Sequence, residues 1–294
     1  MSPSLLVWNP HAGKSTAALI SRVRESLAAH GQVEVIETAP GETTARVASR
    51  LGSTIERVYV LGGDGTVGEV AGALTQSEIP LGIIPCGTTN VLARECRIPV
   101  RPLPAAESLA RSRTTRIFKT WSTGPGTLLL GLGVGFDARL MWRTPAAAKR
   151  RWGVLAVGVT ALCEAIRYDF PEIEIAGEDA TGQPFRAQAT FLLVGNTRRY
   201  AGDAIMLPHA DPSDDMLELL VFSSRRRIPL VAFWGLSVFP GSPHLRVDGV
   251  TTLRARTLRI DAARGVEVHL NGDPHGRTPV RLEPSGRVRM IVPA

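Results

Sequence analysis

The sequence predicts an α/β fold followed by a β-rich fold. Up to about residue 120, short apolar runs alternate with segments of helical pattern, as in a doubly wound parallel sheet. Beyond residue 120, apolar runs separated by turn residues predominate, which is typical of an antiparallel β-sandwich. We therefore expect two domains, an α/β domain over residues 1–120 and a β-sandwich domain over residues 121–294.

The expected elements alternate regularly in the first domain. Short β-prone apolar runs predict its strands, and the intervening segments predict its helices. The strands are 5–8, 33–36, 58–61 and 81–84, and the helices are 15–29, 43–52, 67–76, 88–96 and 104–111. Because ligands of such sheets bind at the carboxyl ends of the strands, the residues after each strand are the first candidates for a site.

In the second domain, strands outnumber helices. One helix is expected at 145–167, and residues 99–104 and 122–126 are candidate connections. The expected strands are 127–132, 172–175, 184–195, 216–222, 252–260, 266–270 and 287–292.

Composition indicates an ordinary globular protein of 294 residues, with 44% hydrophobic and 21% charged residues. No apolar run reaches the roughly 18–20 residues that cross a bilayer. The N-terminus leads almost at once into a strand, so we expect no signal peptide. Three cysteines without close or metal-binding spacing are consistent with a reduced, cytoplasmic location.

The net charge of +7 and the pI near 10.0 suggest an anionic partner. Aromatic residues are only 5% of the chain and no aromatic-basic recognition motif is present, which argues against nucleic acid. Basic residues lie beside Trp and aliphatic residues at Trp142-Arg143, at Lys149–Trp152, and at Arg225–Arg227 before the apolar run 228–234. We therefore expect peripheral contact with an anionic membrane surface, although a solvated basic face beside a core helix is the simpler alternative.

Residues 58–69 (VYVLGGDGTVGE) are the most informative segment. An apolar strand ends in a glycine-rich turn that carries one carboxylate and one hydroxyl and opens a helix. Such a turn exposes backbone N–H groups at the positive end of the helix dipole, where phosphate binds. The expected ligand is therefore a nucleotide.

Two other phosphate-binding motifs fit less well. Gly63, Gly65 and Gly68 match the dinucleotide fingerprint, but the next strand ends at Pro85-Cys86 without the acidic residue that would hold a ribose. The segment Ala12–Ser15 resembles the end of a Walker A loop, but position 8, where that loop needs glycine, is Trp8.

An ordered set of motifs covers nearly the whole chain. The set consists of Asn9-Pro10, Gly62–Thr66, Pro85–Arg94, Gly131–Ala138, Val194–Asn196, Pro208–Ala210, Asp214–Leu217 and Asn271–Asp273. It resembles the diacylglycerol kinase-like catalytic domain shared by bacterial diacylglycerol kinases, sphingosine kinases and ceramide kinases. The resemblance implies a nucleotide-binding α/β domain followed by a lipid-binding sandwich, with ATP as co-substrate and Mg²⁺ as cofactor.

The resemblance and the glycine turns together predict the nucleotide site. Glycines allow the backbone to approach phosphate, and Thr66 adds a hydroxyl. Asp64 would repel bare phosphate, so we expect it to act in catalysis through magnesium, water or ribose. The simpler alternative makes Asp64 a helix cap. The predicted nucleotide-binding residues are Asn9, Thr38, Gly62, Gly63, Asp64, Gly65, Thr66, Gly87, Thr88 and Asn90.

The resemblance also implies a metal site and a general base. Asp215 would provide its carboxylate, and Pro212 and Leu217 their carbonyls, to magnesium. Asp273 would accept the proton of the lipid hydroxyl. Two positions depart from the family pattern: Asn271 stands where the family has Asp, and Val91 where many members have Asp. An amide accepts no proton at neutral pH, so the base role falls on Asp273 alone.

These features predict an ATP- and magnesium-dependent lipid kinase acting at a membrane surface. Its acceptor would be diacylglycerol or a related lipid such as ceramide or a sphingoid base. Two alternatives remain open. An NAD kinase would share the Gly62–Thr66 turn, and a nucleotide-gated lipid-binding protein would carry the same motifs with a base weakened by Asn271.

Overall fold

The computed structural model describes residues 3–13, 15–52, 54–144, 154–200 and 202–294. Contacts divide the chain into two compact units: unit 1 is Met1–Thr120 with Ser285–Ala294, and unit 2 is Trp121–Pro284. Residues 285–294, which we expected in the second domain, thus belong to unit 1. The basic segment Lys149–Trp152 and the start of the expected helix 145–167 lie outside the described residues.

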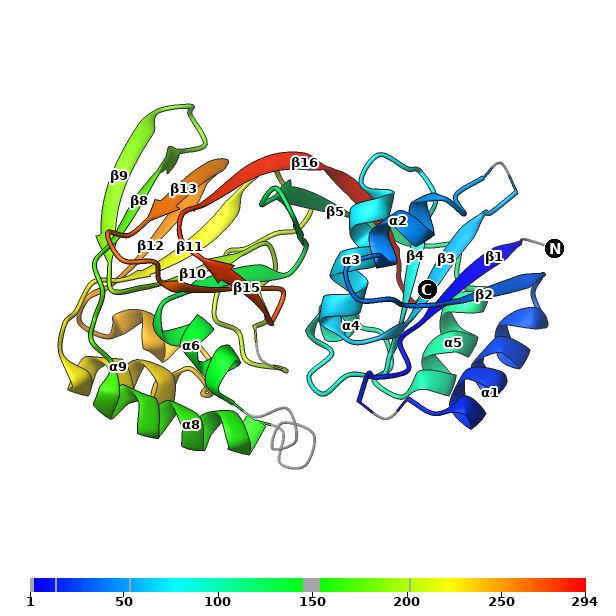
Figure 1. The fold of residues 1–294 in the computed structure, drawn as a ribbon, viewed down its shortest axis with the longest axis horizontal. Coiled ribbons are helices and arrows are strands. Elements are labelled where there is room, and N and C mark those ends of the chain that lie inside the picture. The colour runs from blue at the N-terminus through cyan, green and yellow to red at the C-terminus, as the bar shows by residue number, and fades with distance from the viewer. Residues whose placement is uncertain (1–2, 14, 53, 145–153, 201) are drawn as a thin grey trace. The chain divides into compact units, whose positions relative to one another are not determined.

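Unit 1 is built on a parallel sheet with the strand order β2-β1-β3-β4. Helices α1 and α5 pack together on one face, and α2, α3 and α4 cover the other (Figure 1). The strands are β1 (Ser4–Trp8), β2 (Val33–Glu37), β3 (Arg57–Gly62) and β4 (Leu81–Pro85). The helices are α1 (Ala17–Ala28), α2 (Thr43–Ala48), α3 (Asp64–Leu74), α4 (Val91–Glu95) and α5 (Pro102–Arg111).

The C-terminal segment completes this sheet. Strand β16 (Val280–Ile291) continues past the unit boundary, and its Met290 pairs with Leu81 of β4 in parallel. Val292 donates its N–H to Thr114 O, and Ser112 Oγ donates to Val292 O. These bonds fasten residues 285–294 to unit 1 and explain why they separate from the sandwich.

The strand order places a topological switch point between β1 and β3. From β1 the chain moves outward to β2, and then returns across β1 to β3. The loops after β1 and β3 therefore lead in opposite directions along the sheet. In doubly wound folds, ligands bind in the crevice that forms between two such loops. Asn9 follows β1, and the turn that begins at Gly62 ends β3.

Unit 2 contains a six-stranded sheet with the order β12-β11-β10-β7-β14-β15. All of its pairings are antiparallel. The strands are β7 (Gly131–Val134), β10 (Phe191–Gly195), β11 (Leu217–Phe222), β12 (Val250–Ala255), β14 (Glu267–Leu270) and β15 (Asp273–Arg277). Every residue of β10 and β11 is buried, so both faces of this sheet are covered.

A second sheet and a layer of helices cover those two faces. Residues 280–284 of β16, β13 (Thr257–Asp261), β8 (Ile173–Glu178) and β9 (Pro184–Ala189) form the second sheet. Leu192 and Val194 face it in one apolar core, whereas Phe191 and Leu193 face the helices in another. Figure 1 shows helices α6 (Phe136–Arg143), α8 (Val154–Arg167) and α9 (Arg227–Leu236) on that side of the six-stranded sheet. Unit 2 is therefore layered as helices, inner sheet and outer sheet.

The predicted fold class, a parallel α/β domain followed by an antiparallel sandwich, is confirmed. Several elements differ. The strand expected at 127–132 is two strands, β6 (Thr127–Leu128) and β7, because the N–H groups of Leu129 and Leu130 bond to the Asn271 side chain. The expected strands 184–195 and 252–260 each divide into two as well.

Some elements were not predicted from the sequence. They are β5 (Thr115–Ser122), β15, α6, α9 and a 3₁₀ turn, η1 (Pro243–Arg246). Helix α9 contains Pro229, which lies in the first helical turn, where a missing N–H costs nothing. No helix among the described residues is long and apolar enough to cross a bilayer.

The start of helix α4 depends on Asp64, a residue of α3. The Val91 N–H donates to Asp64 Oδ2 at 3.0 Å, and the Leu92 N–H donates to Oδ1 at 2.9 Å. Asn90, at the N-cap position of α4, makes no side-chain cap bond of its own. A carboxylate from another helix therefore supplies the cap of α4.

Replacement of Asp64 by Ala should destabilise unit 1 locally. Removing both acceptors from the first turn of α4 is expected to cost about 2 kcal/mol, the upper range for a lost cap. Thermal denaturation and amide hydrogen exchange at Val91 and Leu92 measure the effect. The matched control is Glu107→Ala, since Glu107 is an exposed carboxylate on α5. Equal exchange rates in the two variants would contradict the capping role.

Candidate active site

The predicted nucleotide-binding residues of unit 1 lie at the carboxyl ends of its strands. Asn9 Nδ2 donates to Thr66 Oγ1 at 2.8 Å, which joins the turn after β1 to the turn after β3. Asn9 Oδ1 accepts the N–H of His11 at 2.9 Å. Both bonds fix the Asn9 side chain at the switch point of the sheet. Residues far apart in sequence thus form one continuous edge.

The turns after β3 and β4 touch through glycines. A Cβ atom on Gly87 would lie 2.8 Å from the Gly63 Cα and 3.0 Å from Asn90 Oδ1. Real Cβ contacts are not that short, so a larger residue would force the two turns apart. The close approach leaves backbone, rather than side chains, lining this part of the edge. That is the kind of surface which phosphate groups approach.

Helix α3 begins within the same edge. Its N-cap residue is Gly63, which provides no side-chain cap, and its first turn holds Asp64, Gly65 and Thr66. The Val67 N–H bonds to Gly63 O, and the preceding N–H groups belong to the positive end of the helix dipole. The N-terminus of α3 is therefore a position at which an anion is favoured, with the Thr66 hydroxyl beside it.

The Asp64 carboxylate has a different use from the expected one. We expected it to act through magnesium, water or ribose, and in the structure it accepts two N–H groups of α4, with Thr89 Oγ1 at 3.4 Å. The side chain is half-buried. Its observed function is to hold the turn after β4 against the turn after β3. A direct catalytic function of Asp64 stays a prediction.

Asn90 shapes the second turn. Its backbone has a φ of 48°, in the left-handed region that Asn tolerates better than most residues. Its Oδ1 accepts the Gly87 N–H at 2.8 Å, and its Nδ2 donates to Gly87 O at 2.9 Å. The buried Asn90 side chain therefore closes the turn, while Thr88 is exposed on it.

Thr38 follows β2, beside β1. Its N–H donates to Trp8 O at 2.9 Å, which continues the parallel pairing of the two strands by one residue. Thr38 is half-buried. It shares the sheet edge with Asn9, on the outer side of the switch point.

In unit 2, the candidate base Asp273 follows a tightly fixed turn. Asn271 has a φ of 51°, and its Oδ1 accepts the N–H groups of Leu129 and Leu130 at 3.1 and 2.9 Å. Its Nδ2 donates to Thr127 O at 2.8 Å. An aspartate could accept the first two bonds but could not donate the third. Asn271 thus acts as a structural clamp, and the exposed Asp273 begins β15 beside it.

A buried polar cluster lies next to this turn. The side chains of Asp137, Tyr200 and His269 contact one another through Asp137 Oδ2, the Tyr200 hydroxyl and His269 Nε2. The Gly272 N–H donates to His269 Nδ1 at 3.3 Å. Since Nδ1 accepts this bond, Nε2 is the ring nitrogen that donates to Asp137. The cluster is therefore connected to the residue that precedes Asp273.

Burial determines the chemistry of the cluster. Burial, together with the nearby Asp137 carboxylate, raises the pKa of Tyr200 well above its ordinary value, so the hydroxyl stays protonated and donates. Asp137 Oδ1 is buried and has no hydrogen-bond partner among the described residues. A Cβ on Gly133 would overlap Asp137 and His269, so the glycine of β7 makes room for the cluster. Asp137 Oδ1 is therefore a buried acceptor that a hydrogen-bond donor of a ligand could satisfy.

An apolar cavity of about 300 Å³ lies among the helices of unit 2. Residues of α6, α8 and α9 line it, and Tyr200 forms part of its wall. The other lining residues include Phe136, Leu140, Leu162, Trp234 and Val238. Tyr200 therefore belongs both to an apolar cavity and, through its hydroxyl, to the buried polar cluster.

The predicted metal-binding residues lie at the start of β11. Asp215 is exposed, Pro212 and Leu217 are buried, and Asp214 is bonded to the Met216 N–H and to Arg254. One carboxylate with two backbone carbonyls is the kind of donor set that suits a hard cation. No group of three or more His, Cys, Asp or Glu side chains suited to a metal occurs in the described part of the chain.

The strand register brings the base and metal candidates to the same end of the six-stranded sheet. Glu218, Gly195 and Gly131 are in register across β11, β10 and β7, and the Asn271 N–H donates to Gly131 O at 2.7 Å. At about 4.8 Å per strand, the start of β11 and Asn271 are separated by roughly 14 Å. Asp215 and Asp273 therefore flank one sheet end without being immediate neighbours.

Two functional candidates were missed in the sequence. Asp137 was noted only as part of the Gly131–Ala138 motif, and Tyr200 was not singled out. A carboxylate directly after a glycine-rich strand is a signal that could have indicated Asp137. Nothing in the sequence around Tyr200 indicates that its hydroxyl is buried.

Comparison with known proteins agrees with this organisation. Residues 3–120 match the family model described as diacylglycerol kinase catalytic domain, and residues 132–293 match the YegS C-terminal NAD kinase beta sandwich-like domain. The fold resembles the crystal structure of a diacylglycerol kinase from Bacillus anthracis, with a TM-score of 0.72 and 21% identity, covering 99% of this chain and 97% of that chain. At 21% sequence identity, this structural similarity is evidence of a shared fold alone.

Sequence relatives extend over most of the chain. A diacylglycerol kinase of Mycobacterium tuberculosis is 30% identical over 281 residues, which cover 90% of this chain and 86% of the relative. A protein of Pseudomonas aeruginosa named probable lipid kinase YegS-like is 29% identical over 264 residues, covering 86% of this chain and 82% of the relative. The chain therefore belongs to the diacylglycerol and lipid kinase family, and it is an ATP-dependent kinase.

Proposed function

We propose that the protein transfers the γ-phosphate of ATP, with Mg²⁺, to the hydroxyl of diacylglycerol or a related lipid at a membrane surface. The observation that carries this proposal is the apolar cavity of about 300 Å³ in unit 2, one wall of which is Tyr200. A cavity of this kind suits acyl chains, whereas the ribose and phosphates of NAD would need polar lining. The diacylglycerol kinase of Mycobacterium tuberculosis is named for the first of these lipids.

The nucleotide would bind at the switch point of unit 1. The turns that contain Gly62, Gly63 and Gly87 present backbone to the phosphates, and the N-terminus of α3 adds its dipole. Magnesium, when bound with the nucleotide, would neutralise charge that develops on the transferred phosphoryl group. Asn9 and Asp64 support the site by holding its turns together.

The lipid would bind with its chains in the cavity and its polar end toward the buried cluster. The Tyr200 hydroxyl faces Asp137, whose Oδ1 lacks a partner among the described residues. A hydroxyl or amide donor of the lipid would supply that missing hydrogen bond. The same cluster is bonded through His269 to Gly272, next to Asp273.

Asp273 would act as the general base. It would accept the proton from the lipid hydroxyl as the hydroxyl oxygen forms its bond to the γ-phosphorus and the bond to the ADP oxygen breaks. The fixed Asn271-Gly272 turn limits where the Asp273 carboxylate can lie. Asp215, with the carbonyls of Pro212 and Leu217, would hold a supporting cation at the same end of the sheet.

The membrane surface would contact the helical side of unit 2. Leu162 and Ile166 on α8 and Ile228 on α9 are 61%, 67% and 83% exposed. Arg225–Arg227 immediately precede this apolar surface, and Arg227 Nε donates to Ile166 O at 3.2 Å. Exposed aliphatic residues beside arginines suit an interface with anionic headgroups and an oily interior.

The direct test incubates the protein with γ-labelled ATP, magnesium and a mixed lipid extract. We expect one labelled lipid, which mass spectrometry identifies. Label on NAD with none on lipid would replace the proposal with an NAD kinase. ATP binding without any label would indicate a nucleotide-gated lipid-binding protein instead.

Replacement of Asp273 by Asn should lower kcat by about 100-fold or more, because general-base catalysis contributes about that factor. Binding of ATP, measured by calorimetry, should not change, since Asp273 is in unit 2. Asp248→Asn is the matched control, because Asp248 is another exposed aspartate of that unit. If the Asp273 variant turns over as fast as the control, another group is the base.

Replacement of Ala161 by Phe should fill the cavity. The larger side chain would compete with the acyl chains, so KM for the lipid should rise by about tenfold while KM for ATP stays constant. Ala263→Phe, at an exposed turn after β13, provides the control. An unchanged lipid KM would move the lipid site out of this cavity.

Replacement of Leu162, Ile166 and Ile228 by Ser should weaken binding to anionic vesicles by about tenfold or more, because the buried apolar area is lost. Flotation with vesicles measures the bound fraction. Val100→Ser is the control, since Val100 is an exposed aliphatic residue of unit 1. Vesicle binding that survives the triple substitution would exclude the α8–α9 surface as the membrane contact.

A further inference from the structure

The outer face of the second sheet of unit 2 carries a row of arginines. Arg281 of β16 is opposite Arg259 of β13, Arg259 is opposite Ala176 of β8, and Ala176 is opposite Arg186 of β9. Residues in register point to the same face, and neighbouring strands lie about 4.8 Å apart. Four outward positions therefore lie on one line across the sheet. Arginines occupy three of them, and the methyl group of Ala176 occupies the third position, between Arg259 and Arg186.

The charges of this row are not balanced within it. Arg259 pairs with Asp261 at 3.3 Å. Arg186 and Arg281 make no hydrogen bond or ion pair within the described residues. Like charges that face each other across strands destabilise a sheet. An anion bound over the row would remove that repulsion.

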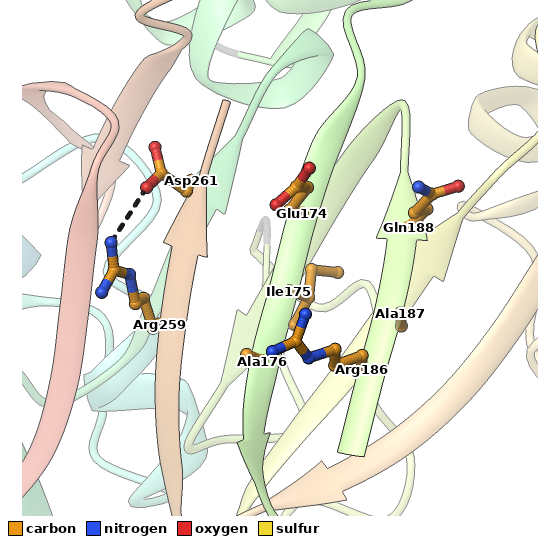
Figure 2. Close-up of a pocket in the computed structure, with 8 residues that line it drawn as sticks. All are labelled: Glu174, Ile175, Ala176, Arg186, Ala187, Gln188, Arg259 and Asp261. Carbon is orange, nitrogen blue, oxygen red and sulfur yellow. Dashed lines mark hydrogen bonds and ion pairs between the residues drawn. The ribbon is translucent and has the colours of Figure 1, made fainter. Parts of the chain in front are cut away.

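The surface is hollowed on both sides of Arg259. One hollow of about 650 Å³ is bordered by Arg186, Arg259 and the short Ala176. Figure 2 shows the Arg186 side chain extending from β9 toward Ala176, while Arg259 is bonded to Asp261 on β13. A second hollow of about 510 Å³ lies along Arg259 and Arg281. An anion over Ala176 would thus lie beside the Arg186 guanidinium, with Arg259 on the neighbouring strand β13 at the border of the same hollow.

We infer that this arginine row binds the phosphate of a small phosphate monoester. Guanidinium groups bind phosphate oxygens in pairs of parallel hydrogen bonds. Glu174, Gln188 and Asp261 border the same hollow. Their oxygens accept bonds from hydroxyl or amino groups of the ligand, and the two carboxylates oppose the larger negative charge of a polyphosphate more than that of a monophosphate. The site therefore favours a monophosphate over a polyphosphate such as ATP.

The ligand comes from solution rather than from the bilayer. The arginine row lies on the outer face of the outer sheet, whereas the helices carrying Leu162 and Ile228 cover the opposite side of the sandwich. A flat bilayer that touches one of these faces does not reach the other. The outward positions of β8, β9 and β13 around the row carry no exposed large apolar side chain that would enter lipid. Within unit 2, the site is thus separate from the proposed lipid site.

Amide chemical shifts of the full chain test the inference. Inorganic phosphate and glycerol 3-phosphate are titrated at constant ionic strength, with Ala176 as reporter and with Gly63 and Gly65 reporting separately on the nucleotide turn. We expect saturable shifts at Ala176, and about tenfold weaker binding in a double variant, Arg186→Gln with Arg281→Gln. Arg264→Gln, an exposed arginine outside the row, should change affinity by less than about twofold.

The other outcomes overturn the inference. Shifts that do not saturate, or that weaken equally in the double variant and in Arg264→Gln, would show that the arginines act only as a general positive charge. Binding confined to vesicles that contain phosphatidic acid, with no response to soluble phosphates, would assign the row to a bilayer. Neither result depends on kinase activity, so a failed lipid assay leaves this test intact.

Discussion

The arrangement of unit 1 depends on the Asp64 carboxylate. It is a residue of α3, yet its two oxygens accept the first N–H groups of α4. This contact holds the turn after β4 against the turn after β3, where a side chain at position 87 would collide with Gly63. Asn9 and Asn90 add bonds within the same edge. These polar side chains position the surface of backbone groups on which we propose that the nucleotide phosphates bind.

Unit 2 is organised by a sheet that is buried on both faces. One face packs against the second sheet, and the other packs against α6, α8 and α9. The apolar cavity lies on the helical side, among α6, α8 and α9. Gly133 lets the Asp137 and His269 side chains approach the same sheet closely. An apolar cavity and a buried polar cluster therefore occur next to each other, joined by Tyr200.

The layering also separates surfaces of different chemistry. The helices expose aliphatic residues, whereas the outward residues of β8, β9 and β13 are mostly polar or charged. The period of two along the strands dictates this division, because alternate residues face the core and the solvent. Asn271 fixes the turn before β15, since its amide donates a bond that a carboxylate could not.

The sequence by itself determined the fold class, the positions of most strands along the chain and the glycine turns, because these depend on local patterns of apolar residues and glycines. It indicated that Asn9, Gly62–Thr66 and Gly87–Asn90 would share one sheet edge, since parallel strands end together. Only the tertiary structure decided that Asp64 caps α4, that residues 285–294 join unit 1, and that Tyr200 meets Asp137 and His269. These contacts join segments as much as 209 positions apart, and no local pattern encodes which distant groups will meet when strands take their register.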